Sequence, residues 1–120
     1  MARYIDGFVL PVPKKNMAAY RRIAQKAGKI WRAHGALDYV ECAGDDLNVP
    51  IGLPFPRGIK TKPGETVMFS YIVYKSRAHR DSVNKKVMAD PRIHALCDPK
   101  NTPFDCKRML YGGFKAIVEA

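Results

Sequence analysis

The stretch that decides the fold is Glu65-Thr66-Val67-Met68-Phe69-Ser70-Tyr71-Ile72-Val73-Tyr74. Its β-branched and aromatic residues favour an extended strand. Apolar side chains occupy both the odd and the even positions, so we expect both faces of this strand to be buried. Residues 3–12 have the same property. Pro11 and Pro13 are expected to end that earlier strand, because proline cannot donate a hydrogen bond to a sheet ladder.

The clearest helix is predicted between these two strands, over residues 14–34. Its apolar and aromatic residues recur in steps of three and four, which is typical of one helical stripe. They are Met17, Tyr20, Ala24, Ala27, Trp31 and His34. Gly35 is a natural left-handed cap. Ser76 is expected to cap a second helix that runs through Ala89 and stops at Asp90-Pro91.

Two further strands, over residues 36–43 and 109–119, complete the element order. Gly112-Gly113 in the last strand indicates a bulge or a close approach of another group. The order strand, helix, strand, strand, helix, strand predicts an α+β ferredoxin-like βαββαβ fold with a four-stranded antiparallel sheet. We expect a single domain over residues 1–120, with a long loop at about 44–64 that is either functional or wraps a partner.

The predicted sheet has one face that its own helices cannot cover. Two helices cover only one face of four strands, yet the first and third strands, which are central in this topology, are apolar on both faces. In a chain of 120 residues the simplest cover is a second copy. The sequence therefore predicts a symmetric homodimer.

Charge and cysteine usage restrict the possible partners. The net charge of +10 can attract nucleic acid through non-specific electrostatics. Cys42, Cys97 and Cys106 are odd in number and form no C-x-x-C pair, which favours reduced thiols and a cytoplasmic location. The chain has no run of eighteen apolar residues and its first residues do not form a signal peptide, so no membrane association is expected.

Several motifs resemble the YbaA-like family of bacterial proteins of unknown function. They are residues 4–13, 35–42, 88–92, 103–105 and 107–114, so the resemblance covers nearly the whole chain. Cys106 stands where relatives carry glycine, which can alter the turn. The resemblance implies the dimeric α+β barrel superfamily, in which two ferredoxin-like sheets pack face to face. It implies no reaction, although related families include cofactor-free monooxygenases, haem-degrading enzymes and stress-responsive proteins.

Asp6 is the most informative polar residue because it falls within a predicted central strand. A buried carboxylate is costly unless it is paired or faces a wet cavity. The last strand lies beside the first in this topology, so Arg108 or Tyr111 is a candidate partner. Asp6 could be a general base or a substrate anchor. The favoured interpretation is a structural salt bridge or a dimer contact.

The other candidate residues also have two interpretations each. Glu41 is expected to be a solvated carboxylate on an edge strand. Asp105 and Arg108 either bind an anion or form ion pairs within their own loop. Trp31 and His34 either pack in the core or line a pocket with Tyr71 and Tyr111. His94, Cys97 and Cys106 lack a zinc spacing, and no nucleotide motif occurs, so neither a metal nor a cofactor is expected.

Three functions remain open from the sequence. The favoured one is a homodimeric small-molecule-binding or stress-associated protein without catalysis. The second is a cofactor-independent dimeric-barrel enzyme of the oxygenase or isomerase type, with Asp6 as base and Arg108 as anion anchor. The third is a basic nucleic-acid-associated protein. RNA-recognition motifs share this strand order and stack bases on aromatic residues, here Tyr4 or Phe8 with Phe69 and Tyr71.

Overall fold

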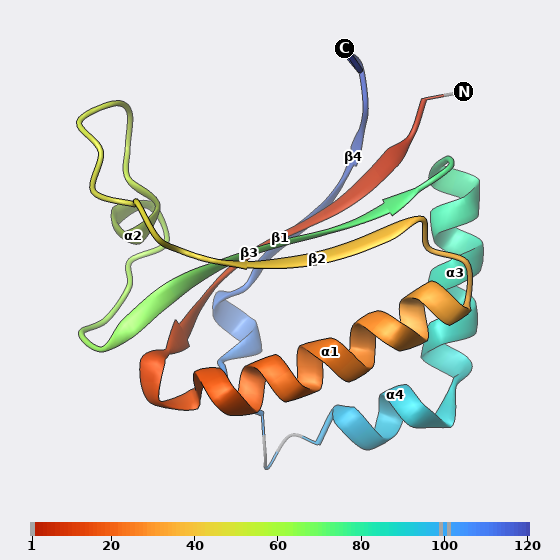
Figure 1. Cartoon of the computed structure of the whole chain (residues 1–120), viewed down its shortest axis with the longest axis horizontal. Helices are drawn as coiled ribbons and strands as arrows, with labels where there is room; N and C mark the ends of the chain where they lie inside the picture. The colour runs from red at the N-terminus through yellow and green to blue at the C-terminus, as the bar shows by residue number, and fades with distance from the viewer. Residues whose placement is uncertain (1, 99, 101) are drawn as a thin grey trace.

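A computed structural model describes residues 2–98, 100 and 102–120. The strands are β1 (Tyr4–Pro13), β2 (Asp38–Ala43), β3 (Glu65–Tyr74) and β4 (Leu110–Lys115). The helices are α1 (Met17–Ala33), α2 (Phe55–Gly58), α3 (Arg77–Ala89) and α4 (Pro91–Leu96), with 3-10 turns η1 (Lys14–Asn16) and η2 (Cys106–Arg108). All strand pairs are antiparallel, in the order β2-β3-β1-β4. The ferredoxin-like α+β fold predicted from the sequence is confirmed (Figure 1).

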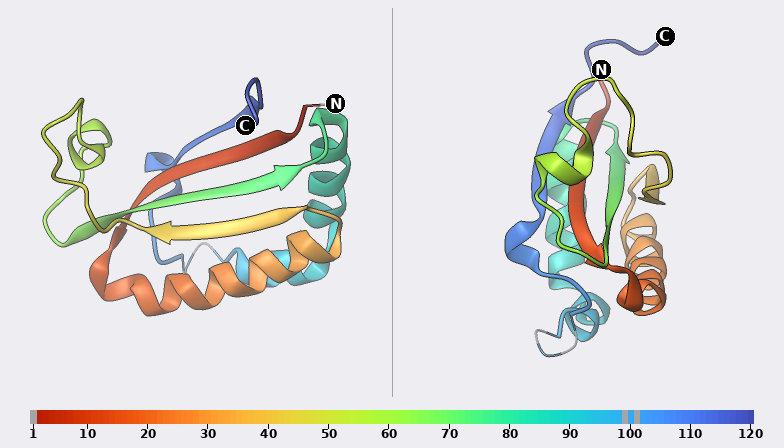
Figure 2. Two further views of the ribbon diagram at one scale, coloured as in Figure 1. Left: turned by 45° about the horizontal axis from the view of Figure 1, so that its top comes forward. Right: turned by 90° about the vertical axis from the view of Figure 1, so that its left-hand side faces the viewer.

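The three longer helices lie on the same side of the sheet (Figures 1 and 2). The core lies between these two layers. On β1 the residues that face the helices are the even-numbered ones, and cross-strand pairing places Leu10 opposite Met68 on β3. Leu10, Val12, Tyr74, Val83 and Val87 are each at most 1% exposed. The side chains of β1 and β3 that face the helices therefore pack against the apolar stripe of α1 and form the predicted core.

β1 ends at Pro13, close to the predicted end, but Pro11 lies within the strand. Pro11 and Pro13 both pair with β3, opposite Val67 and Glu65. β4 pairs with β1 only from Tyr4 to Val9. The prolines therefore lie where β1 has no neighbour on its other side, and the missing N–H breaks no ladder there.

The last strand is shorter than predicted and contains no bulge, because its register with β1 is continuous from Leu110 to Lys115. The Gly112-Gly113 pair instead marks a place where another side chain comes close to the strand backbone. A Cβ atom on Gly113 would lie 2.7 Å from Cε2 of Tyr4. Glycine is required there because the tyrosine ring crosses the strand backbone.

The predicted helix ends are confirmed. The Ser76 side chain accepts a hydrogen bond from the backbone N–H of His79, and Gly35 follows α1 with a φ of 112°. β2 begins at Asp38 rather than at residue 36, because the buried Ala36 belongs to the turn that leaves the helix.

The sheet face opposite the helices is apolar and uncovered in the single chain. The odd-numbered residues of β1 lie on this face. Phe69 and Leu110 flank Val9, and Phe114 lies opposite Ile5. Phe69, Leu110 and Phe114 are 45%, 57% and 62% exposed. The 44–64 loop lies beyond one end of this face and the two termini lie near the other (Figure 1).

Candidate functional site

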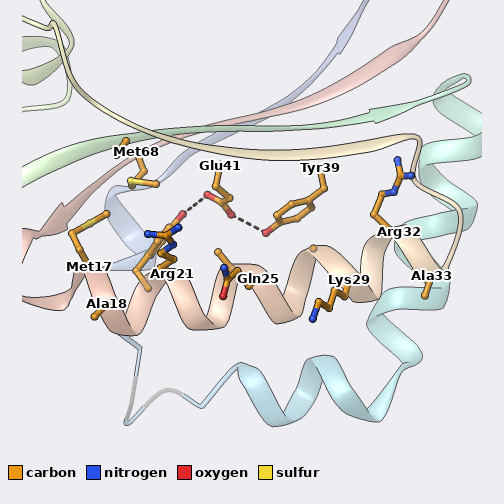
Figure 3. A pocket seen from close by; sticks show the side chains of 14 residues that line it. Met17, Ala18, Arg21, Gln25, Lys29, Arg32, Ala33, Tyr39, Glu41 and Met68 are labelled. Carbon is orange, nitrogen blue, oxygen red and sulfur yellow. Dashed lines mark hydrogen bonds between the residues drawn. The ribbon is translucent and has the colours of Figure 1, made fainter.

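Glu41 is the centre of a polar cluster between α1 and the sheet. Its Oε1 atom accepts a hydrogen bond of 2.7 Å from the Tyr20 hydroxyl, and its Oε2 atom accepts one of 2.8 Å from the Tyr39 hydroxyl. Tyr20 lies on the buried stripe of α1, and Tyr39 and Glu41 are alternate residues of β2. The prediction that Glu41 is a solvated edge carboxylate was wrong, because strand alternation turns its side chain under the helix (Figure 3).

Both tyrosines remain hydrogen-bond donors over the whole physiological pH range. Burial, reinforced by the negative charge of Glu41, raises the pKa of Tyr20 and the pKa of Tyr39 well above the usual range. Each Glu41 oxygen keeps a free lone pair after accepting one hydrogen bond from a tyrosine hydroxyl. The cluster is therefore a fixed acceptor that can receive a hydrogen bond from a bound molecule.

Gly28 makes this arrangement possible. A Cβ atom at this position of α1 would lie 2.8 Å from Cδ1 of Tyr39. Such a contact is too close to be kept, so any side chain there would displace the tyrosine ring. The ring also lies 6.0 Å from the Trp31 ring, between centroids. The glycine thus sets the position of one of the two donors to Glu41.

Two hollows meet at this cluster, and both are lined by Tyr20, Ala24, Tyr39 and Glu41. The inner cavity has a volume of about 190 Å³ and lies between the sheet and the helices. Its other walls are mainly apolar and include Phe8, Ile23, Trp31, Met88, Ile93 and Met109. The outer hollow is an open groove of about 1100 Å³ between α1 and the edge strand β2 (Figure 3). Pockets for small molecules commonly measure about 300–1,000 Å³, so the groove is large enough for one.

Asp6 belongs to a different, fully paired network. Its Oδ1 atom lies 2.6 Å from Nη1 of Arg80 on α3, and Asn84 Nδ2 lies 3.4 Å from its Oδ2 atom. Asn84 in turn accepts hydrogen bonds from Trp31 and from the Tyr74 hydroxyl. The sequence had suggested Arg108 or Tyr111 as the partner of Asp6, and the ion pair is instead with Arg80. Asp6 is 1% exposed and lines neither hollow.

Tyr111, the other partner suggested for Asp6, belongs to the Asp6 network. The Arg80 guanidinium donates a hydrogen bond of 3.2 Å to the Tyr111 hydroxyl. The Tyr111 ring stacks on Phe8 with centroids 4.9 Å apart. Burial, together with the nearby Asp6 charge, raises the pKa of Tyr111. The tyrosine thus remains a neutral neighbour of the buried ion pair.

Arg108 and Asp105 have structural partners. Arg108 contacts Glu65 through two nitrogen–oxygen pairs of 2.6 and 2.9 Å and also donates to the Lys60 carbonyl. The hydrogen bonds from Arg108 hold the pKa of Glu65 at about 2. Asp105 accepts a hydrogen bond from the backbone N–H of Lys107 and so caps η2. The ion pair thus connects η2 to the start of β3, and it does not lie within one loop as predicted.

The remaining predicted pocket residues are dispersed. His34 Nε2 lies 2.7 Å from Oδ2 of Asp90, between α1 and α4. Tyr71 packs edge-on against Phe69, with centroids 6.2 Å apart, on the uncovered face. Trp31 and Tyr71 both border the inner cavity, whereas His34 and Tyr111 are not among its lining residues. The structure therefore brings two of the four predicted residues, Trp31 and Tyr71, to one cavity and places His34 and Tyr111 elsewhere.

The aromatic platform considered for RNA does not form. Tyr4 and Phe8 lie on the helix-covered face of β1, whereas Phe69 and Tyr71 lie on the opposite face of β3, paired with Val9 and Gly7. Strand alternation separates the two pairs, so they cannot stack bases on a common surface.

Sequence reasoning missed Tyr20, Tyr39, Arg80 and Asn84. The alternation of Tyr39 with Glu41 in β2 was the available signal, because residues two apart share a face of a strand. No local pattern marked Arg80, which is 74 residues from Asp6.

The architecture and the site together define the class. The chain is a ferredoxin-like α+β protein with an uncovered sheet face and a polar cluster beneath its first helix. It superposes on a dimeric ferredoxin-like protein from an uncultured marine organism with a TM-score of 0.64, 11% identity and full coverage of both chains. A NIPSNAP family protein of unknown function from Agrobacterium tumefaciens gives a TM-score of 0.61 at 14% identity, over 95% of this chain and 87% of that chain.

The sequence comparison is more specific. Residues 3–106 match the family described as Protein of unknown function (DUF1428), and the chain belongs to this family. It is 43% identical to the uncharacterized protein YbaA of Escherichia coli K12 over 117 residues, which cover 98% of each chain. The YbaA of Shigella flexneri matches to the same extent. In the described part of the chain, no helix has the length and apolar character needed to cross a membrane.

Proposed function

We propose that this protein is a homodimer that binds a small molecule between α1 and the sheet, with Glu41 as the polar centre of the site. The observation that carries the proposal is the position of the Glu41 carboxylate, which two tyrosines hold where the apolar cavity meets the open groove. Mainly apolar walls with a few fixed polar groups are typical of small-molecule sites.

Catalysis by Asp6 is not part of this proposal. The Asp6 carboxylate is paired with Arg80, is 1% exposed and borders neither hollow. A general base must come within hydrogen-bond reach of the proton that it removes. Its network instead supports a structural role in joining β1 to α3.

The homodimer is supported by the uncovered sheet face. Exposed aromatic and aliphatic side chains cluster on it, and contiguous apolar surface of this kind marks an interaction site. Ile51, Leu53, Ile117 and Val118 are 66–90% exposed on the loop and tail beside this face. If a second copy packed on this face, the loop and tail of each chain would contact the sheet and helices of the other chain.

The binding site can be tested with the methionine methyl groups as reporters. Met17 and Met68 line the groove, whereas Met88 and Met109 line the inner cavity. We expect members of a fragment set of small aromatic alcohols, amines and carboxylates to shift the NMR signals of ¹³C-methyl-labelled Met17 and Met68. A folded protein in which no fragment moves either pair would contradict the proposal.

A matched pair of glycine variants separates the site from general stability. Gly28→Ala forces the Tyr39 ring away from Glu41 without removing a polar group. Gly58→Ala adds the same methyl group in α2, where the nearest atom is Cδ2 of Leu53 at 3.8 Å. We expect about a tenfold loss of fragment affinity for Gly28→Ala, since a charge-assisted hydrogen bond loses its geometry, and no loss for Gly58→Ala. Equal affinities in the two variants would overturn the role of the cluster.

A further inference from the structure

The outer groove has an uneven distribution of charge. Arg21, Gln25 and Lys29 line it from α1 at a spacing of four residues, so they form one row along the helix. Arg32 lines its far end. Glu41 is the one carboxylate among the lining residues. The groove thus combines a single negative group at its junction with the inner cavity and three positive side chains, Arg21, Lys29 and Arg32, along its helical wall.

Two of these cations are available to a ligand. The Arg32 guanidinium donates to the Leu37 carbonyl and is held at the end of the helix. Within the part of the chain that the structure describes, Arg21 and Lys29 have no hydrogen-bonding or ion-pairing partner on their side chains. Both are exposed at the rim. An anionic group that reaches the rim would gain charge-assisted hydrogen bonds without displacing an existing one.

The floor of the groove has a different character. Met17, Ala24 and Met68 line it together with the ring of Tyr39, which offers an apolar surface for a ring or a short chain. Glu41 accepts hydrogen bonds from both tyrosines, so its remaining lone pairs select a group that donates. A carboxylate in contact with Glu41 would be repelled, and this orients an anionic ligand with its charge toward the rim.

We infer that the groove takes a small amphipathic organic anion that also carries a hydroxyl or amino group. The apolar body lies on Met17, Met68 and Tyr39, the anionic group lies at Arg21 and Lys29, and the donor reaches Glu41. This inference rests on the proposed function and adds the chemical class of the ligand.

The competing occupant of a basic helix is nucleic acid, and α1 offers a matched control for it. Arg22 and Lys26 are exposed cations of the same helix, but they do not line the groove. The double variant Arg21→Ala/Lys29→Ala therefore removes the same charge as Arg22→Ala/Lys26→Ala. Only the first pair is expected to matter for a ligand held in the groove, whereas nucleic acid attracted to the helix would lose affinity with both.

The test uses three probes: para-hydroxybenzoate, benzoate and phenol. They share one aromatic body and carry, respectively, both polar groups, the anion alone and the donor alone. We titrate each into the ¹³C-methionine-labelled protein and follow Met17 and Met68. We expect para-hydroxybenzoate to bind about tenfold more tightly than either of the others, because it makes one more charge-assisted hydrogen bond. We expect Glu41→Gln to remove its advantage over benzoate.

The outcomes are separable. The inference is supported if Arg21→Ala/Lys29→Ala weakens para-hydroxybenzoate about tenfold and the control pair changes it less than twofold. It is overturned, while the binding site stands, if phenol binds as tightly as para-hydroxybenzoate and the first pair has no effect. It is also overturned if both pairs weaken the anions equally, which indicates general attraction to α1. If neither these probes nor the wider fragment set moves either methionine pair, the proposed function fails.

Discussion

At the scale of single residues, the most consequential side chain is Asp6. It is a buried carboxylate in a central strand, and the structure pairs it with Arg80 at 2.6 Å while Tyr4 lies over the guanidinium at 4.9 Å. All buried side-chain polar atoms of the described residues have a hydrogen-bond partner. A charge network that is complete in this way stabilises one arrangement of α3 on the sheet.

The first prediction is that Arg80→Met destabilises the fold by about 3–5 kcal/mol, because it leaves the Asp6 charge buried without its partner. Chemical denaturation measures the change. The control is Arg77→Met, which removes an exposed arginine from the same helix and should leave the free energy of unfolding nearly unchanged. The double variant Asp6→Leu/Arg80→Met should recover part of the loss, since no lone charge remains. If Arg80→Met is as stable as the wild type, the Asp6 carboxylate does not need Arg80 as its partner and the prediction is wrong.

At the scale of elements, the ion pair between Arg108 and Glu65 attaches η2 to the start of β3. The same arginine reaches the Lys60 carbonyl, so it also holds the end of the 44–64 loop. The start of the loop is also attached to β3, because the backbone N–H of Gly44 donates to the Val67 carbonyl.

The second prediction concerns the pH dependence of this attachment. The pKa of Glu65 is lowered from 4.5 to about 2 in the folded protein, first of all by the hydrogen bonds from Arg108. A lowered pKa stabilises the fold fully above the unfolded value, and this stabilisation is lost as the pH falls through the folded value. The wild type should therefore be more stable than Arg108→Gln at neutral pH, and the difference should shrink between pH 4.5 and about 2.

Denaturant melts across that pH range measure the difference. Arg57→Gln serves as the control, because it removes an exposed arginine of α2 and should show no such convergence with the wild type. A constant difference between wild type and Arg108→Gln at every pH would rule out Glu65 as the titrating partner.

At the scale of the whole molecule, the third prediction is the mass in solution. We expect light scattering to give twice the chain mass of 13.5 kDa. Phe69→Glu places a charge in the uncovered face and should reduce the mass to that of one chain, because a desolvated charge at an interface is costly. Ser82→Glu adds the same charge at an exposed position of α3 that lines neither hollow and should leave the mass unchanged. A wild-type protein with the mass of a single chain would contradict the dimer.

The fold could be predicted from the sequence to a large extent, and the candidate site could not. Period-two and period-four patterns identified all four main strands and the two long helices, and they correctly marked β1 and β3 as the central strands. The sequence was less informative at proline and glycine, whose effect depends on the neighbouring strand. Pro11 is tolerated because β4 stops short of it, and Gly113 is needed because Tyr4 crosses it.

The sequence by itself determined which segments form strands and helices, their order, and the presence of an apolar sheet face that the chain cannot cover. These properties follow from side-chain periodicity and caps, which act within a few residues. Only the tertiary structure decided which polar groups meet: Asp6 with Arg80 rather than Arg108, and Glu41 with Tyr20 and Tyr39. Such pairs depend on how each helix lies across the sheet, and the packing of the whole core sets that placement.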